Sequence, residues 1–268
     1  MGRIQATFER LQQQRRQALI PFLTAGDPDL VTTEALVHEL VSAGADLIEL
    51  GMPFSDPMAD GPTIQAASER ALAAGTRLGD VLELVRRVRR HTNVPLVLMG
   101  YYNPILYYGP ERFARDAAEA GVDALLLVDL PPEESGEIAG FLQQNGLCQI
   151  TLLAPTTPPE RMVELAAQAE GFLYYVSMTG VTGAQQVDAQ AIEAAVRQLR
   201  ALSPVPVAVG FGIATAADVA AVGAFADAVV VGSALVKIIA SHGREADLVA
   251  RVGEFVRNLK TGLPGAAA

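Results

Sequence analysis

The chain has 268 residues, half of them hydrophobic, and carries a formal net charge of -10. This length suits a single large α/β domain, because barrels often exceed 200 residues without dividing. The acidic balance argues against nucleic acid and anionic membrane surfaces as partners, since both attract basic proteins. Cys148 is the only cysteine, which excludes an internal disulfide and makes a reduced, cytoplasmic setting the simplest interpretation.

The first predicted element is a helix over residues 1–16, where Ile4, Phe8 and Leu11 recur at helical spacing. This segment lacks the apolar centre of a signal peptide. Eight β-rich runs follow, and stretches of helical period separate them. The runs span residues 18–26, 46–54, 95–102, 124–132, 148–155, 172–180, 206–212 and 228–234.

These runs are nearly continuous in apolar residues, which is typical of a parallel sheet covered on both faces. Eight strand–helix units in a chain of this length favour a (β/α)8 TIM barrel over an open doubly wound sheet. We expect extra short helices in the second unit, over residues 62–72, and in the eighth unit, after the last strand. No linker divides the chain, so we expect one domain over residues 1–268, with a frayed tail at 262–268.

In such a barrel the chemistry lies where strands end and the following loops begin. Polar residues occupy these points, namely Asp27, Asp56, Asp60, Asn103 and Asp129. An acid also interrupts the second strand, in the stretch LIELGMPFSDPMADGP. Because side chains alternate along a strand, Glu49 shares a face with Leu47 and Gly51, while Ile48 and Leu50 face the other way.

We interpret Glu49 as pointing into the barrel near its mouth, since an acid packed among the outer helices would have little to do. Burial there would raise its pKa and let it exchange protons near neutral pH. The alternative is a structural carboxylate, satisfied by a neighbouring hydroxyl or cation. Asp60 is either a second functional acid or a turn former, and Asp56, directly before Pro57, favours a turn role.

Glycines follow the last predicted strands in a way that suits a phosphate. In barrels, the loops after strands 7 and 8 often bind phosphate together with a short helix. Gly212 would let backbone amides approach an anion, and Gly232 and Ser233 would begin a helix with free N–H groups. An acidic protein can hold an anion in this way without a basic cluster.

Other chemistries have less support in the sequence. The histidines His38, His91 and His242 lie apart from the acidic loop, and no G-x-S-x-G occurs, so a serine triad is not expected. One cysteine and no paired histidines argue against zinc. A magnesium site from Glu49, Asp56 and Asp60 stays conceivable, although the apolar neighbours of Glu49 disfavour it. No predicted barrel strand contains a lysine that could form a Schiff base.

Five segments, in this order and spacing, closely resemble the tryptophan synthase alpha chain family: PFLTAGDP, IELGMPFSDPMADGPTIQ, GVTGA, GFGI and VGSALVKII. The resemblance runs from about Pro21 to about Ile239, and its acidic loop motif is highly specific. It implies cleavage of indole-3-glycerol phosphate to indole and glyceraldehyde 3-phosphate, without a bound cofactor. It also implies an alpha2beta2 heterotetramer with a beta chain, which carries pyridoxal phosphate and receives the indole through a tunnel.

The same resemblance implies roles for individual residues. Glu49 is the proton-transferring acid/base, and Asp60 is the carboxylate that engages the indole nitrogen. The indole pocket is lined by Phe22, Met99, Tyr101, Leu126, Leu152, Tyr174 and Phe211. The phosphate is held by Gly183, Gly212, Gly232 and Ser233. Thr182 reaches Asp60 when the GVTGA loop closes.

The stretch YYNPILYYG, after the third strand, carries more aromatic and aliphatic surface than a loop normally exposes. Its side chains either cap the barrel rim or form an interface, and the resemblance favours docking of the beta chain. The residues concerned are Tyr102, Ile105, Leu106, Tyr107 and Tyr108, with Pro53, Pro57 and Pro131 nearby.

Three other functions stay open at this point. The chain could be a stand-alone lyase that releases indole, because the sequence does not say whether a partner is always present. It could be another phosphate-binding barrel enzyme of the same pathway, or a catalytically silent subunit that only activates its partner.

Overall fold

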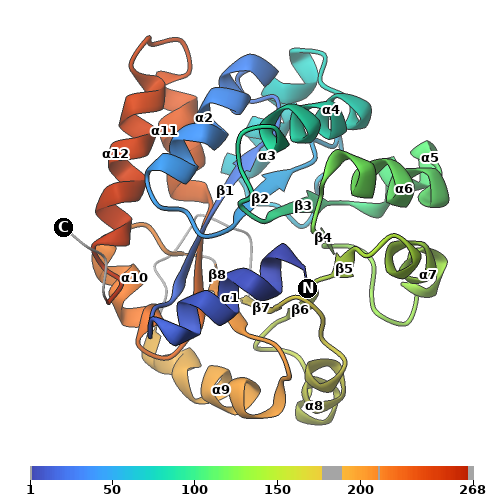
Figure 1. The fold of residues 1–268 in the computed structure, drawn as a ribbon, viewed down its shortest axis with the longest axis vertical. Coiled ribbons are helices and arrows are strands. Elements are labelled where there is room, and N and C mark those ends of the chain that lie inside the picture. The colour runs from blue at the N-terminus through green and yellow to red at the C-terminus, as the bar shows by residue number, and fades with distance from the viewer. Residues whose placement is uncertain (1, 177–188, 211, 265–268) are drawn as a thin grey trace.

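A sheet of parallel strands forms the centre of the protein, and helices surround it (Figure 1). The computed structural model describes residues 2–176, 189–210 and 212–264. Within them, nine strands follow the order β5-β4-β3-β2-β1-β9-β8-β7-β6. The two end strands, β5 and β6, are separated in the chain only by Ile150, so the sheet curls into a nearly closed barrel. The predicted TIM barrel is confirmed.

The strands are short and apolar, and most of their residues are buried. They are β1 (Ala18–Thr24), β2 (Ile48–Gly51), β3 (Leu96–Gly100), β4 (Ala124–Leu127), β5 (Cys148–Gln149), β6 (Thr151–Leu153), β7 (Leu173–Val176), β8 (Val207–Gly210) and β9 (Ala228–Val231).

The helices alternate with the strands, and the second, third and eighth barrel units each contain two. They are α1 (Arg3–Gln13), α2 (Leu30–Ser42), α3 (Pro62–Ala73), α4 (Leu78–Arg89), α5 (Tyr102–Tyr108), α6 (Pro110–Ala120), α7 (Gly136–Gln144), α8 (Pro159–Ala167), α9 (Ala189–Leu202), α10 (Ala216–Gly223), α11 (Ser233–His242) and α12 (Leu248–Lys260). The extra helices expected in the second and eighth units are thus confirmed as α3 and as one of the pair α11 and α12. None of the helices in the described ranges is long and apolar enough to cross a membrane.

Two apolar layers follow from the alternation of side chains along the strands. In β1, Ala18 and Ile20 belong to the cluster inside the barrel, whereas Leu19 and Leu23 belong to the layer between sheet and helices. The outer layer is the larger of the two, because it holds the apolar faces of most helices.

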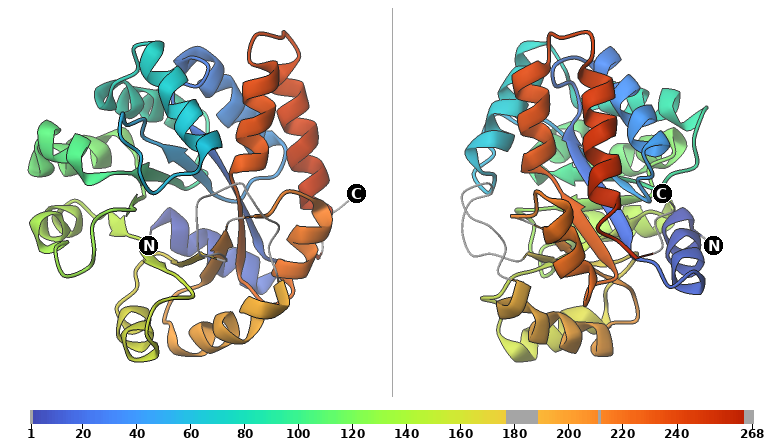
Figure 2. Two further views of the ribbon diagram at one scale, coloured as in Figure 1. Left: turned by 180° about the vertical axis from the view of Figure 1, so that it is seen from behind. Right: turned by 90° about the vertical axis from the view of Figure 1, so that its left-hand side faces the viewer.

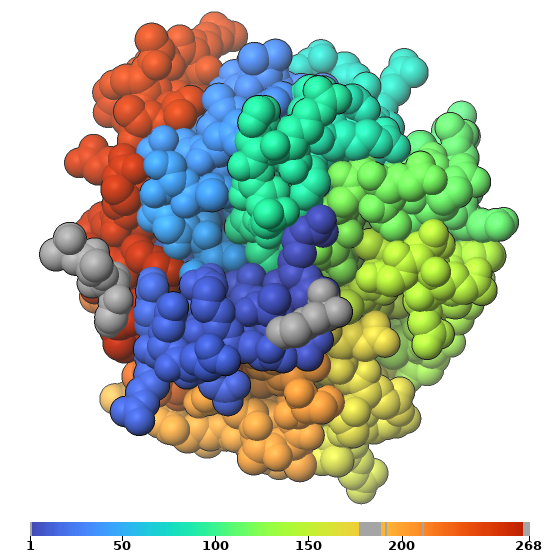
Figure 3. All heavy atoms as spheres, viewed as in Figure 1, coloured from blue at the N-terminus to red at the C-terminus, as the bar shows by residue number. Residues whose placement is uncertain are grey.

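Helix α1 closes one end of the barrel. Its residues Ile4, Phe8 and Leu11 are buried in the same cluster as the inward-facing strand residues. Figure 2 (right) shows α1 and the N-terminus together on one side of the molecule, and in Figure 3 the atoms of α1 cover the middle of this face. This is the end where the strands begin, so the strand ends lie at the opposite mouth.

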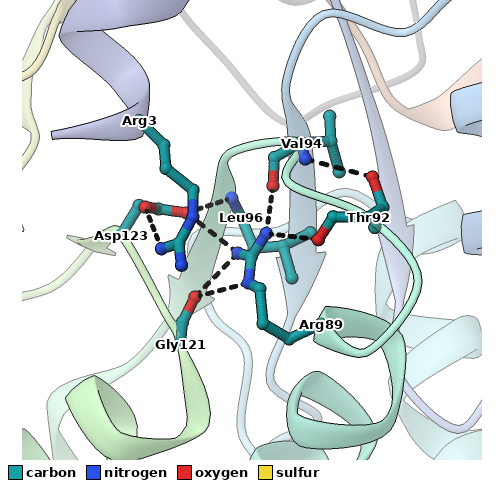
Figure 4. Close-up of polar contacts among 7 residues, drawn as sticks. All are labelled: Arg3, Arg89, Thr92, Val94, Leu96, Gly121 and Asp123. Carbon is teal, nitrogen blue, oxygen red and sulfur yellow. Dashed lines mark hydrogen bonds and ion pairs between the residues drawn. The ribbon is translucent and has the colours of Figure 1, made fainter.

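Aspartates tie the strand starts together at the end that α1 covers. Each one lies just before a strand and accepts a hydrogen bond from a backbone N–H of the neighbouring strand. Each also pairs with a cation from a helix. The aspartates are Asp46, Asp123 and Asp227, and their cations are Lys260, Arg89 and Arg200 in that order. Figure 4 shows Asp123 between Arg89 and Arg3, the latter from α1.

Three details differ from the sequence-based expectations. The fifth strand is not continuous: β5 pairs with β4 and β6 pairs with β7, so the chain changes partner at Ile150. The stretch after β3 is not a loop but the helix α5, whose first turn accommodates Pro104. Leu263 is buried against the outer layer, so packed structure continues beyond residue 262, where the tail was expected to begin.

Candidate active site

Glu49 lies in the middle of β2 and points into the barrel. Its register partners are Phe22 in β1 and Val97 in β3, and Leu47, on the same face of the chain, belongs to the interior cluster. The predicted orientation is therefore confirmed. The side chain is 0% exposed, and neither carboxyl oxygen has a hydrogen-bond partner among the described residues. Burial raises the pKa of Glu49 from 4.5 to about 8, so the group holds its proton at neutral pH.

Tyr174, on β7, lies near Glu49 inside the barrel. Burial and, second, the negative charge that Glu49 would carry raise the pKa of Tyr174 far above its ordinary value of 10.0. Its hydroxyl occupies the space beside Gly210, where an added Cβ would lie only 2.1 Å from the Tyr174 oxygen. A neutral phenol and an apolar wall therefore surround the acid, which favours its uncharged form.

Asp60 lies in the turn between β2 and α3, directly before the Gly61 N-cap of that helix. Its pKa rises from 3.8 to about 6 because burial disfavours the carboxylate, while a hydrogen bond from the Tyr101 hydroxyl partly opposes the rise. The same hydroxyl accepts a 3.0 Å hydrogen bond from the Ala59 N–H. Asp60 is thus largely ionised at pH 7, whereas Glu49 is largely protonated.

Residues predicted to line an indole pocket lie on neighbouring strands at this mouth. Phe22 pairs in register with Glu49, Met99 with Leu126, and Leu152 with Tyr174. One cavity touches both the acid turn and part of this wall, and among the residues lining it are Phe22, Met99, Tyr101 and Asp60.

Two of the three glycines predicted to bind phosphate, Gly212 and Gly232, follow the ends of β8 and β9. Gly212 has a φ of +73°, a conformation that side chains other than glycine rarely adopt. Gly232 is the N-cap of α11 and Ser233 is its first residue, so the free N–H groups of this helix begin here. A Cβ on Gly232 would lie 3.6 Å from Phe22, the register partner of Glu49. The side chain of Phe22 therefore lies between the start of α11 and Glu49.

Several predicted residues lie outside the described part of the chain. These are Thr182 and Gly183 in the GVTGA loop, and Phe211 after β8. Their predicted roles stay predictions.

Two polar residues at this mouth were not predicted. Thr24 lies two positions beyond Phe22 on the inward face of β1, and no described residue forms a hydrogen bond with its buried hydroxyl. Ser68, on α3, is buried and lines the same cavity as Thr24 and Asp60. The alternation that placed Glu49 also places Thr24 inside the barrel, so the sequence contained that signal. No pattern in the sequence pointed to Ser68, because α3 is an additional helix outside the regular alternation of strands and helices.

No group of three or more histidine, cysteine, aspartate or glutamate side chains gathers as a metal site would within the described ranges. Asp56 is exposed and accepts a hydrogen bond from Ser55, so it does not join Glu49 in the barrel. His38 and His91, distant in the sequence, do meet, with ring centroids 5.4 Å apart. That pair corrects the expectation of scattered histidines, but no third metal-binding side chain from the described ranges accompanies it.

The fold is a parallel (β/α)8 barrel. Its mouth holds a buried neutral acid, a second acid on a turn and the start of a helix. This combination is typical of a TIM-barrel enzyme. The model of the family described as tryptophan synthase alpha chain matches residues 8–264. The tryptophan synthase alpha chains of Citrifermentans bemidjiense and Geobacter sulfurreducens are 56% and 55% identical, over 98% and 97% of this chain and 98% of each relative.

Solved structures agree with this match. Tryptophan synthase subunit alpha from Legionella pneumophila superposes with a TM-score of 0.90 at 44% identity and covers 98% of both chains. A chain of the tryptophan synthase complex from Pyrococcus furiosus gives a TM-score of 0.82 at 39% identity, over 92% of this chain and 99% of that one. The chain belongs to the tryptophan synthase alpha chain family.

Proposed function

We propose that Glu49 and Asp60 divide between them the chemistry of the reaction that this family carries out. That reaction cleaves indole-3-glycerol phosphate to indole and glyceraldehyde 3-phosphate, a lyase step of tryptophan biosynthesis, and it is the activity of this chain. The observation that carries the division of roles is the contrast in environment. One acid is fully buried and has no hydrogen-bond partner in the described part of the chain, and the other lies on a turn beside a phenol.

Glu49 acts first as an acid. The carbon–carbon bond breaks in a retro-aldol step, and an aromatic ring leaves poorly until its C3 carbon is protonated. A protonated Glu49 in an apolar wall can supply that proton. Once ionised, it removes the proton from the side-chain hydroxyl as the aldehyde forms, so the carboxyl group ends the cycle protonated again.

Asp60 acts through its charge. Protonation of C3 places positive charge on the ring nitrogen, and a nearby carboxylate stabilises that charge as it develops. With a pKa of about 6, Asp60 is mostly ionised at the pH at which Glu49, with a pKa of about 8, still holds its proton. The pair therefore has the required protonation states together only between about pH 6 and pH 8.

The wall and the helix start would seat the substrate. We assign the indole ring to the wall formed by Phe22, Met99, Tyr101, Leu126, Leu152 and Tyr174, with Phe211 as a further predicted member. The phosphate would bind at Gly212, Gly232 and Ser233, where free helix N–H groups favour an anion. Gly183 is predicted to join them, and Thr182 to reach Asp60. The closeness of Gly232 to Phe22 supports this arrangement, because the two ends of the substrate would then lie beside the neighbouring strands β1 and β9.

The mechanism uses no cofactor in this chain, and family membership is consistent with that. The partner is the tryptophan synthase beta chain, as expected for an alpha2beta2 assembly, and pyridoxal phosphate is expected only in that partner. We place the docking surface at the rim formed by α5 and the turn after β2. Tyr107 is 97% exposed and Met58 is 83% exposed, which supports an apolar contact there. Ile105 is not part of this surface, because α5 turns it into the core.

The remaining assignments concern the whole chain. We propose that residues 1–268 form one domain, since β1, near the start of the chain, pairs directly with β9, near its end. A reduced, cytoplasmic location fits a chain with a single cysteine.

An indole-release assay on the purified chain, with and without a beta chain, tests the function. Wild-type protein should release indole from indole-3-glycerol phosphate, Glu49→Gln should release less than a few per cent as much, and Asp60→Asn should also be severely impaired. Cleavage by the isolated chain would exclude a catalytically silent subunit. Absence of indole under all conditions would favour another phosphate-binding barrel enzyme, and unimpaired Glu49→Gln would refute the assigned role.

A further inference from the structure

The side chain of Gln65 holds the turn that carries Asp60. Its amide nitrogen donates a 2.8 Å hydrogen bond to the backbone carbonyl of Asp60 and a 3.3 Å hydrogen bond to that of Pro57. These carbonyls belong to the first and last residues of the turn, which the Asp60 N–H closes by a 3.0 Å bond to the Pro57 oxygen. One side chain therefore fastens both ends of the turn.

The orientation of this amide follows from its partners. A glutamine amide has two N–H donors, and both face carbonyl oxygens, which can only accept. No other side chain of similar length offers two neutral donors at one atom. Methionine has the same length and a similar helix propensity but cannot donate, and a glutamate carboxylate would face the two oxygens with negative charge.

Helix α3, which carries Gln65, is fixed to the barrel. Its residues Ile64 and Ala67 pack with Phe22 of β1 in one apolar cluster. Further along the helix, Arg70 forms two 2.7 Å hydrogen bonds with the buried carboxylate of Asp27, just after β1. Gln65 thus reaches the turn from a base that does not depend on the turn itself.

On its opposite side the turn contacts Tyr101. Its hydroxyl meets the Ala59 N–H and the Asp60 side chain, so it grips the middle of the turn and the acid. The next residue after Pro57, Met58, is almost fully exposed, so apolar packing does little to hold the turn down. Without the Gln65 amide, the carbonyls of Pro57 and Asp60 would lose these hydrogen bonds, and water could replace them if the turn moved outward.

We propose that Gln65 is the positioning residue for Asp60: its amide holds the turn inward, so that the carboxylate stays at the barrel mouth instead of swinging into solvent. The inference rests on the proposed role of Asp60. It goes beyond that role by assigning the placement of the acid to a side chain that touches neither the substrate nor the reacting atoms.

The test is the pH dependence of kcat/KM for indole release by Gln65→Met, measured beside wild type. We expect a roughly ten-fold fall in kcat/KM at pH 7, because the carboxylate is no longer held in place. We also expect the acid limb of the profile to move from about pH 6 towards the ordinary aspartate value of 3.8, since a solvated Asp60 loses the burial that raised its pKa. The alkaline limb, which belongs to Glu49, should not move.

The matched control is Gln144→Met, the same exchange at an exposed position on α7. It should leave both limbs and kcat/KM within two-fold of wild type. Gln65→Asn, which keeps the amide but is one methylene too short, should displace the acid limb as Gln65→Met does. It serves as the second variant if Gln65→Met unfolds at the assay temperature.

The outcomes separate the inference from the proposed function. If the wild-type acid limb persists in Asp60→Asn, the role of Asp60 itself fails. If that limb belongs to Asp60 but stays in place in both Gln65 variants, only the inference fails, even where activity has dropped. Displacement of both limbs together would also overturn it, because that result marks a general change in structure.

Discussion

Replacing Glu49 by glutamine should stabilise the protein, by an amount that grows with pH. In the unfolded chain this carboxyl ionises near 4.5, whereas in the folded barrel burial holds its pKa at about 8. Between these values the unfolded state loses its proton and the folded state keeps it. The free energy of unfolding therefore falls as pH rises through this interval, and the fall is complete above pH 8.

The magnitude follows from the interval. At about 1.4 kcal/mol for each pH unit, the span from 4.5 to about 8 corresponds to roughly 5 kcal/mol, and the part reached at pH 7 to roughly 3 kcal/mol. Glutamine has the shape of the neutral acid and cannot ionise, so the free energy of unfolding of Glu49→Gln does not fall with pH in this way. Other titrating groups contribute equally to both proteins and cancel in the difference.

Urea unfolding of wild type and Glu49→Gln at pH 5, 7 and 8.5 measures the effect. The difference in unfolding free energy should be small at pH 5 and widen in favour of the variant at each higher pH. A difference that stays constant across the three values would show that Glu49 ionises alike in both states. The argument from its burial would then be refuted.

Three further predictions concern other residues. Arg70→Met leaves the Asp27 carboxylate, 1% exposed, without its cation and should cost about 3–5 kcal/mol of unfolding free energy. Asp27→Asn should cost less, because the Arg70 side chain is 35% exposed and can reach water; equal losses by urea denaturation would contradict this. Arg15 is exposed and has a φ of +54°, so Arg15→Gly should raise the free energy of unfolding by about 0.5–1 kcal/mol, and a loss would contradict the assumed backbone strain. Asp60→Asn should remove the acid limb near pH 6 from the residual kcat/KM, and its persistence would assign that limb to another group.

Much of the barrel could be predicted because its signals are local. Alternation along residues 47–51 was enough to place Glu49 of β2, and Leu47 just before it, on the inward face. The glycines after β8 and β9 were also a local signal, because Gly212 has a left-handed backbone and Gly232 caps the start of α11.

What the sequence did not predict depends on contacts between distant residues. Asp46 and Lys260 pair at the covered end of the barrel although 214 positions separate them, and no local pattern indicates this. The run from Cys148 to Leu153, CQITLL, contains neither glycine nor proline, so nothing in it signals the change of partner at Ile150. Gln65 belonged to a recognised motif, yet its role became visible only when α3 placed its amide over the turn.

Difference infrared spectroscopy of wild type against Glu49→Gln gives the most direct measurement of the buried acid, because the carbonyl band of a protonated carboxyl reports its own titration. The band should be present at pH 7, missing in the variant, and lost with a midpoint near pH 8. A wild-type protein without the band at pH 7, or one in which it titrates near 4.5, would mean that Glu49 reaches the substrate already ionised and cannot deliver the proton that starts the cleavage.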